Sequence, residues 1–272
     1  MVAEELVKAG RPAEALKALQ DEVRSKASDA KLRVFLFQLL AITGQWERAL
    51  TQLNVSGDLD AGNLLMVQVC QHGLASEALR LEIFGGQKLP LVLGEPPEWL
   101  AWLIQANQMT GTRQHAEGQA LRQRAFDAAP VTPGSLNGQR FEWIADADQR
   151  LGPVLEAIID GKYYWVPFAN IRELTMEAPT DLRDLVWAPA TITWVNGGKV
   201  IALLPARYPG IQPASDPALQ LARRTDLVDA EGGLVIGQGQ RQWITDASET
   251  PLLEVRNLQL DQTADIKTVV EG

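Results

Sequence analysis

A ten-residue segment near the start of the chain returns 34 residues later, and this repeat constrains the fold more than any other feature of the sequence. Residues 10–19 read GRPAEALKAL and residues 44–53 read GQWERALTQL, so the glycine, one alanine and both leucines recur at one constant offset. A period of about 34 residues is that of the tetratricopeptide helical hairpin. Each such hairpin has an apolar face that it cannot bury alone, so hairpins stack and leave a curved surface open to partners.

The repeated residues have clear physical roles in a helical hairpin. We expect Gly10 and Gly44 to lie in the turns between paired helices, because glycine adopts positive φ without a steric clash. The small Ala15 and Ala49 let the second helix lie close to the first. The apolar run 31–42 predicts a helix packed between neighbours. Asp29, just before it, is a candidate N-cap or first-turn acid.

A weaker third copy follows at residues 111–117 (GTRQHAE), between the apolar segment 99–104 and the helix-like segment 120–126. We expect it to extend the array to roughly three hairpins, which is about the minimum for a stable stack. Residues 62–84 are expected to form two shorter helices with an irregular link. The glycines and prolines of residues 85–97 then interrupt the regularity.

Beyond Pro130 the pattern changes from helices to strands. The segment 196–198 (NGG) separates two strand-like segments and is the strongest hairpin signal in the chain. One further helix is expected from Arg150 to Ile159. The segments with strand character are 163–168, 190–195, 199–204, 240–245 and 252–258. The predicted fold class is therefore α+β: tetratricopeptide-like helical hairpin repeats in residues 1–130, then a smaller β-rich mixed domain in residues 131–272.

Composition restricts the partners and the compartment. The 272 residues carry a net charge of −9, with 46% hydrophobic and 22% charged residues, which is ordinary for a globular protein. Excess acid argues against nucleic acid and against an anionic membrane surface, since both attract basic proteins. A single cysteine, Cys70, excludes an intrachain disulfide. With no secretory pattern at the start and no apolar run long enough for a bilayer, we expect a cytoplasmic protein.

Residues with catalytic or metal-binding character are few. Glu142, Asp146 and Asp148 lie among aromatic residues and could hold a divalent metal or act in acid–base chemistry. The alternative is that they cap local structure and pair with arginines. The segments 179–187 and 207–210 likewise place charged residues near aromatic ones, and the same two interpretations apply to them. No histidine or nucleophile accompanies these residues, so the structural interpretation is favoured, and we predict no catalytic residue, no cofactor and no metal.

Several long phrases together resemble the ImpE/TagJ family, accessory proteins of bacterial type VI secretion. The resemblance runs nearly end to end and is carried by residues 3–6, 30–40, 44–50, 141–148, 151–156, 163–168, 181–187 and 207–210. It implies a non-enzymatic cytoplasmic protein that binds TssB, the smaller subunit of the contractile sheath, through a short helix near the TssB N-terminus. The implied role is in sheath assembly, or in coupling the contracted sheath to the disassembly ATPase ClpV.

The leading hypothesis is an adaptor whose hairpins clasp an amphipathic helix. If the repeat register holds, the residues that point to the concave, partner-binding side are Lys31, Val34, Gln38 and Ala41 in the second repeat and Ala101, Gln105 and Gln108 in the third unit. Ordinary packing between helices is the alternative for these positions. The acidic second half, or an edge strand containing Trp194, is another possible contact surface. Two further hypotheses are a metal-dependent enzyme built on the acidic cluster and a general helical scaffold or chaperone.

Overall fold

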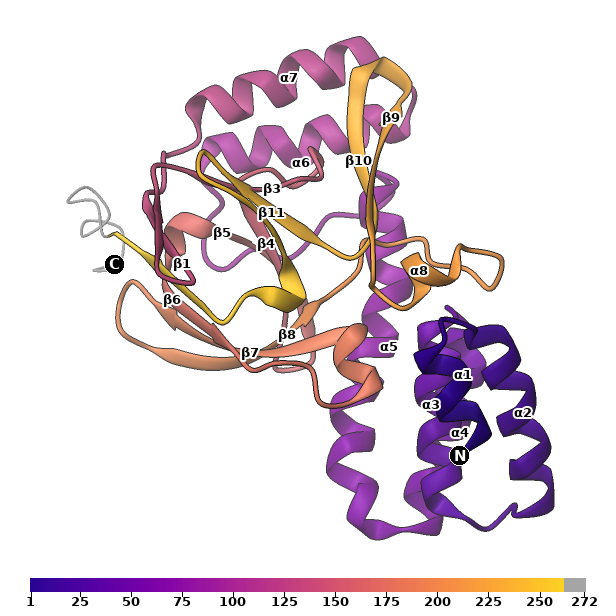
Figure 1. Ribbon diagram of the computed structural model, residues 1–272. Coiled ribbons are helices and arrows are strands. Elements are labelled where there is room, and N and C mark those ends of the chain that lie inside the picture. The colour runs from indigo at the N-terminus through magenta and orange to yellow at the C-terminus, as the bar shows by residue number, and fades with distance from the viewer. Residues whose placement is uncertain (262–272) are drawn as a thin grey trace.

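The computed structural model describes residues 1–261, in which the helices come first and the strands follow (Figure 1). The helices before residue 130 are α1 (Val2–Lys8), α2 (Pro12–Ser25), α3 (Ala30–Ile42), α4 (Trp46–Leu59), α5 (Leu64–Phe84), α6 (Glu98–Gly111) and α7 (His115–Ala128). The strands are β1 (Gly134–Leu136), β2 (Gln139–Phe141), β3 (Ile144–Asp146), β4 (Val154–Ile159), β5 (Lys162–Pro167), β6 (Ile171–Met176), β7 (Trp187–Trp194), β8 (Lys199–Pro205), β9 (Thr225–Ala230), β10 (Leu234–Gly239), β11 (Gln242–Thr245), β12 (Glu249–Pro251) and β13 (Asn257–Leu260). Short helical turns between them include η3 (Leu182–Leu185) and α8 (Pro217–Gln220). This order confirms the predicted α+β fold class.

Both hairpins of the 34-residue repeat are present. The chain turns at Gly10 between α1 and α2 and at Gly44 between α3 and α4, with φ of 75° and 70°. Asp29 caps the start of α3, where its carboxylate accepts hydrogen bonds from the backbone N–H groups of Lys31 and Leu32. Local signals therefore identified these turns and this cap correctly.

The segment predicted as two short helices is one continuous helix, so that prediction was wrong. α5 runs for 21 residues without a break. Gly73, near its middle, does not interrupt it, and the missing side chain makes room for the ring of Trp187. A Cβ atom at Gly73 would lie 2.8 Å from two ring carbons of that tryptophan. A contact from the distant second half thus accounts for this glycine.

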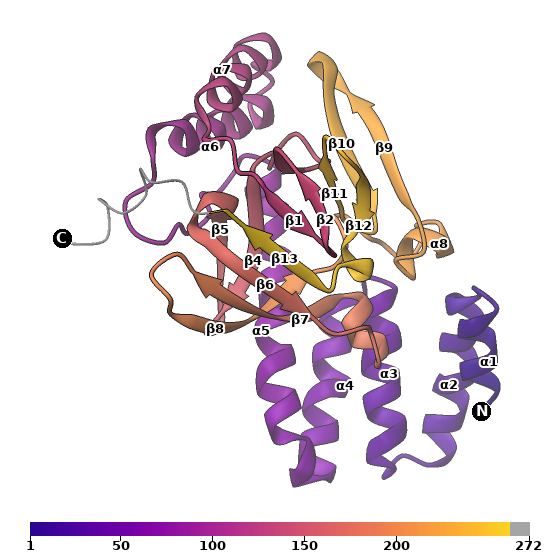
Figure 2. The ribbon, with the colours of Figure 1, turned by 60° about the vertical axis from the view of Figure 1, so that its left-hand side comes forward.

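The third hairpin forms from α6 and α7, but it does not continue the stack of the first two. Figures 1 and 2 show α1 to α4 at one end of the molecule and α6 with α7 at the other, with α5 running between the two groups. In the turn of this hairpin Arg113, with φ of 64°, adopts the positive φ that glycine has in the first two. The predicted array of three neighbouring hairpins is therefore two hairpins, one long helix and a separate hairpin.

The second half is centred on an eight-stranded sheet of the described chain, in the order β2-β1-β13-β6-β7-β8-β4-β5. Neighbouring strands are antiparallel throughout. The predicted hairpin around residues 196–198 is the β7–β8 connection. The prediction of a helix from Arg150 to Ile159 is wrong, because residues Val154–Ile159 form strand β4. All six residues of this strand are buried. A short apolar run buried on both faces cannot be told from a buried helix by periodicity.

The hydrophobic core crosses between the two halves. One cluster joins Leu39 and Leu100 of the helices to Trp165 and Trp187 of the sheet. A second cluster lies within the β-rich half. The predicted division near residue 130 falls between the end of α7 and the start of β1. We propose two structural units on that division, joined by a shared core.

Candidate partner-binding surfaces

The predicted partner-binding residues do not form one surface. They come from α3 and α6, which lie in the separate helical groups at the two ends of the molecule (Figure 1). The exposed members are Lys31, Ala101 and Gln105, and the half-buried ones are Val34 and Gln108. Gln38 is only 7% exposed and Ala41 is 0% exposed. The expectation that these two side chains face a partner is therefore corrected, since the chain itself covers them.

The second half of the chain covers the end of α3. The guanidinium of Arg207 donates to the backbone carbonyls of Ile42, at 2.7 Å, and Ala41, at 3.0 Å. The last carbonyls of a helix have no partner within it, and a cation at this end is favoured by the helix dipole. Burial lowers the pKa of Arg207 to about 10, so the group stays charged at neutral pH. The short helix η3 also contacts α3.

Trp187, the first residue of β7, fills space between α4 and α5. Its ring centroid lies 6.2 Å from that of Trp46. Its indole Nε1 donates to Glu77 on α5 at 3.0 Å, and its ring lies over Gly73. The side chain of Trp187 thus packs against both α4 and α5.

The acidic cluster is tied into arginine pairs. Arg241 Nη1 donates to Asp146 at 2.5 Å, and Arg150 Nη2 donates to Asp148 at 2.5 Å. Burial raises the pKa of Asp146, and the neighbouring Arg241 opposes that shift. Glu142 is exposed. The interpretation of Asp146 and Asp148 as partners of arginines is confirmed.

Arg80 on α5 lies at the centre of the same buried network. It donates to Glu77 at 2.8 Å, to Glu156 on β4 at 2.8 Å, and to the backbone carbonyl of Arg207 at 2.7 Å. Glu156 also accepts hydrogen bonds from Arg241 and from the hydroxyl of Tyr163. Arg80 and Glu156 are each 1% exposed. The network therefore attaches α5 to the sheet from inside the molecule.

Within residues 1–261, no group of three or more His, Cys, Asp or Glu side chains is placed to hold a metal ion. Over the same part of the chain, none of the helices combines the length and the hydropathy needed to cross a membrane.

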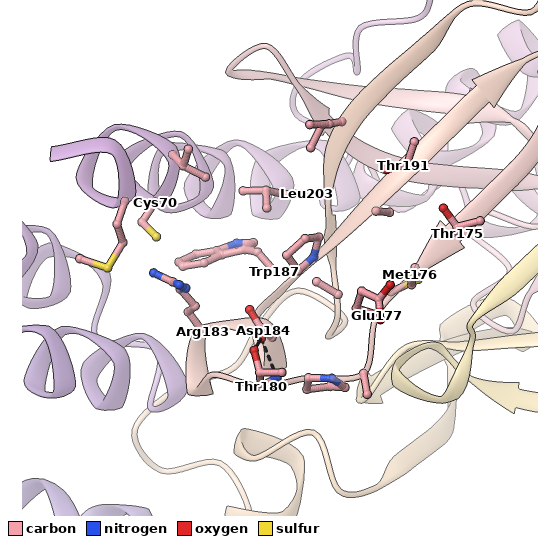
Figure 3. A pocket seen from close by; sticks show the side chains of 18 of the residues that line it. Cys70, Thr175, Met176, Glu177, Thr180, Arg183, Asp184, Trp187, Thr191 and Leu203 are labelled. Atoms are coloured by element: carbon pink, nitrogen blue, oxygen red, sulfur yellow. Dashed lines mark hydrogen bonds between the residues drawn. The ribbon is translucent and has the colours of Figure 1, made fainter. Parts of the chain in front are cut away.

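An open apolar groove of about 840 Å³ lies between α5 and the face of β6, β7 and β8. We call it the α5–β8 groove. It is lined by Leu65, Met66, Val69, Cys70, Thr175, Met176, Glu177, Ala178, Pro179, Thr180, Arg183, Asp184, Trp187, Ala188, Pro189, Ala190, Thr191, Ile201 and Leu203. Figure 3 shows Cys70 and Arg183 on one side, Met176 and Glu177 on the other, and Trp187 between them. Leu65 is 74% exposed and Ile201 is 77% exposed.

Two charged groups of the α5–β8 groove, those of Asp184 and Arg183, are engaged in local structure. The carboxylate of Asp184 accepts hydrogen bonds from the N–H groups of Thr180 and Asp181, each at 2.9 Å, and so caps η3. Arg183 lies 3.7 Å from the carboxylate of Asp181. Burial raises the pKa of Cys70 to about 11. The groove could not be predicted from the sequence, because its two sides come from segments far apart in the chain.

Together these features define an α+β molecule in which helical hairpins are attached to an antiparallel sheet, with an exposed apolar groove at their junction. The sequence model of the ImpE protein family matches residues 138–259. The type VI secretion system accessory component TagJ of Pseudomonas aeruginosa is 52% identical over 263 residues, which cover 97% of this chain and 92% of that protein. The crystal structure of a Vibrio parahaemolyticus protein has the same fold, with a TM-score of 0.86 and 25% identity over 98% of this chain and 100% of that one. The chain belongs to the ImpE family of type VI secretion accessory proteins.

Proposed function

We propose that the chain is a non-enzymatic cytoplasmic adaptor of the type VI secretion system that binds the small sheath subunit TssB through an N-terminal helix of that subunit. By this contact it modulates sheath assembly or the ClpV-dependent disassembly of the contracted sheath. The similarity to TagJ over nearly the whole chain supports a place in the secretion system.

The observation that carries the binding role is the exposed apolar character of the α5–β8 groove. Two aliphatic side chains, Leu65 and Ile201, leave about three quarters of their surface in water. Exposed apolar side chains gathered in a groove are a common feature of sites that bind other molecules. An amphipathic helix laid into an apolar groove is a common mode of peptide recognition.

Calorimetric titration of the full chain with a synthetic peptide spanning the N-terminal helix of the cognate TssB tests this proposal. We expect one-to-one binding with a Kd in the micromolar range or tighter. A peptide of the same composition with the apolar residues scrambled is the control, and it should give no heat of binding. Absence of binding to the helical peptide, together with absence of co-purification with intact TssB, would contradict the adaptor role.

A further inference from the structure

We infer that the partner helix docks in the α5–β8 groove and that this helix carries basic residues beside its apolar stripe. The inference rests on the proposed function and deepens it, since it places the contact and states the chemistry of the partner. The inner side of the hairpins is a poorer candidate, because Gln38 and Ala41 are buried there and Arg207 already binds the end of α3.

The exposure of the groove walls favours a macromolecular partner over a small molecule. A small ligand is usually enclosed, with most of its surface buried and a few free polar groups to orient it. Here Leu65 on one side and Ile201 on the other project into water. The carboxylate of Asp184 is already bonded to backbone N–H groups. Covering both aliphatic side chains therefore requires an apolar surface that extends across the groove.

The backbone at the groove floor favours a helix over an added strand. β7 is hydrogen-bonded to β6 from Ala190 to Trp194 and to β8 from Trp187 to Thr193. Pro189, in the stretch that β6 does not cover, has no N–H group to offer an added strand. An extended peptide binds a sheet through the free N–H and C=O groups of an edge strand. β7 lies inside the sheet, so recognition there takes place through side chains. A helix supplies such contacts from residues spaced three and four apart.

The charges around the groove indicate which charged residues the partner helix carries beside its apolar stripe. Glu177 is an exposed carboxylate on one side of the groove (Figure 3). Among the groove residues of the described chain, Arg183 is the sole cation, and it lies beside Asp181. The whole chain has a net charge of −9. Complementary charge speeds association and selects the partner, so lysines or arginines flank the apolar stripe.

The test measures binding of the TssB helix peptide to three single variants of the full chain. Leu65→Asp and Ile201→Asp each place a charge on a groove wall, and both positions are exposed enough to tolerate it. Leu227→Asp on β9, at a site 47% exposed and outside the groove, is the matched control. We expect Kd to rise by at least about tenfold for the two groove variants and by less than about twofold for the control. Circular dichroism verifies that all three are folded.

Glu177→Lys tests the charge. It should weaken binding and flatten the dependence of Kd on salt, because one attractive charge becomes repulsive. If the unchanged protein binds the peptide and both groove variants bind equally well, the groove assignment is overturned and the adaptor role stands. If the unchanged protein binds neither the peptide nor intact TssB, the proposed function fails and this inference fails with it. If Glu177→Lys leaves binding and its salt dependence as they were, the basic flank is overturned.

Discussion

Replacing Arg80 by methionine removes the cation at the centre of the buried network that attaches α5 to the sheet. The change deletes hydrogen bonds to Glu77, to Glu156 and to the carbonyl of Arg207. Glu156 keeps Arg241 and Tyr163 as partners, whereas Glu77, 5% exposed, keeps only the indole of Trp187 among these contacts. Breaking a buried ion pair from one side costs about 3–5 kcal/mol, because the remaining charge stays buried without compensation.

For Arg80→Met we expect the free energy of unfolding to fall by about 3–5 kcal/mol, as measured by urea titration with far-ultraviolet circular dichroism. Tm should fall by on the order of 10 °C. The matched control is Arg24→Met, because Arg24 pairs with Asp21 at 2.7 Å on a surface where the two side chains are 76% and 61% exposed. An exposed pair contributes little, so this variant should be as stable as the original.

A double variant distinguishes two causes of the expected loss of stability: the Glu77 carboxylate left buried without a cation, and the packing lost with the Arg80 side chain. Arg80→Met combined with Glu77→Leu removes the carboxylate that Arg80→Met leaves behind, and it should recover part of the lost stability. Unchanged stability of Arg80→Met would refute the reasoning. A double variant at least as unstable as the sum of its two single changes would show that the buried charge is not the cause.

Two further predictions concern the helical half. Burial raises the pKa of Cys70 to about 11, so at pH 8 roughly 0.1% of the thiol is ionised, against roughly 20% for an ordinary thiol. Its reaction with Ellman's reagent should therefore be at least about a hundredfold slower in the folded protein than in guanidinium, and equal rates would contradict the burial. Gly44→Ala and Gly94→Ala both place a side chain at positive φ, 70° and 72° respectively. At Gly44 the added Cβ would lie 2.2 Å from the carbonyl oxygen of Ile211, whereas at Gly94 it would meet no atom within 4 Å. Gly44→Ala should therefore cost about 1–3 kcal/mol more than Gly94→Ala in a urea titration; equal costs would mean that the turn moves freely away from residue 211.

The features that were predictable are those set by neighbours in the chain. The 34-residue repeat located the turns at Gly10 and Gly44, and Asp29 was identified as a cap for the helix that follows. The run at 196–198 located the β7–β8 hairpin. Each of these depends on the backbone preferences of a few adjacent residues, so it can be read from a short window.

The features that were mispredicted depend on distant contacts. β4 was predicted as a helix because its burial on both faces leaves no alternation to read. The glycine in the middle of α5 is explained by a tryptophan more than a hundred positions later, whose ring a side chain at Gly73 would meet. The position of the third hairpin is a matter of packing as well, since α6 and α7 pair with each other as predicted but lie apart from α3 and α4.

The sequence by itself determined the succession of a helical half and a β-rich half, the first two hairpins and the family, because these follow from local preference and from long characteristic phrases. Only the tertiary structure decided which of those elements meet. It buried Gln38 and Ala41, directed Asp146 and Asp148 to arginines, and brought Leu65 together with Ile201 in one groove. The reason is physical: burial, ion pairing and the groove itself arise between residues far apart in the chain, and such contacts leave no periodic trace in either segment alone.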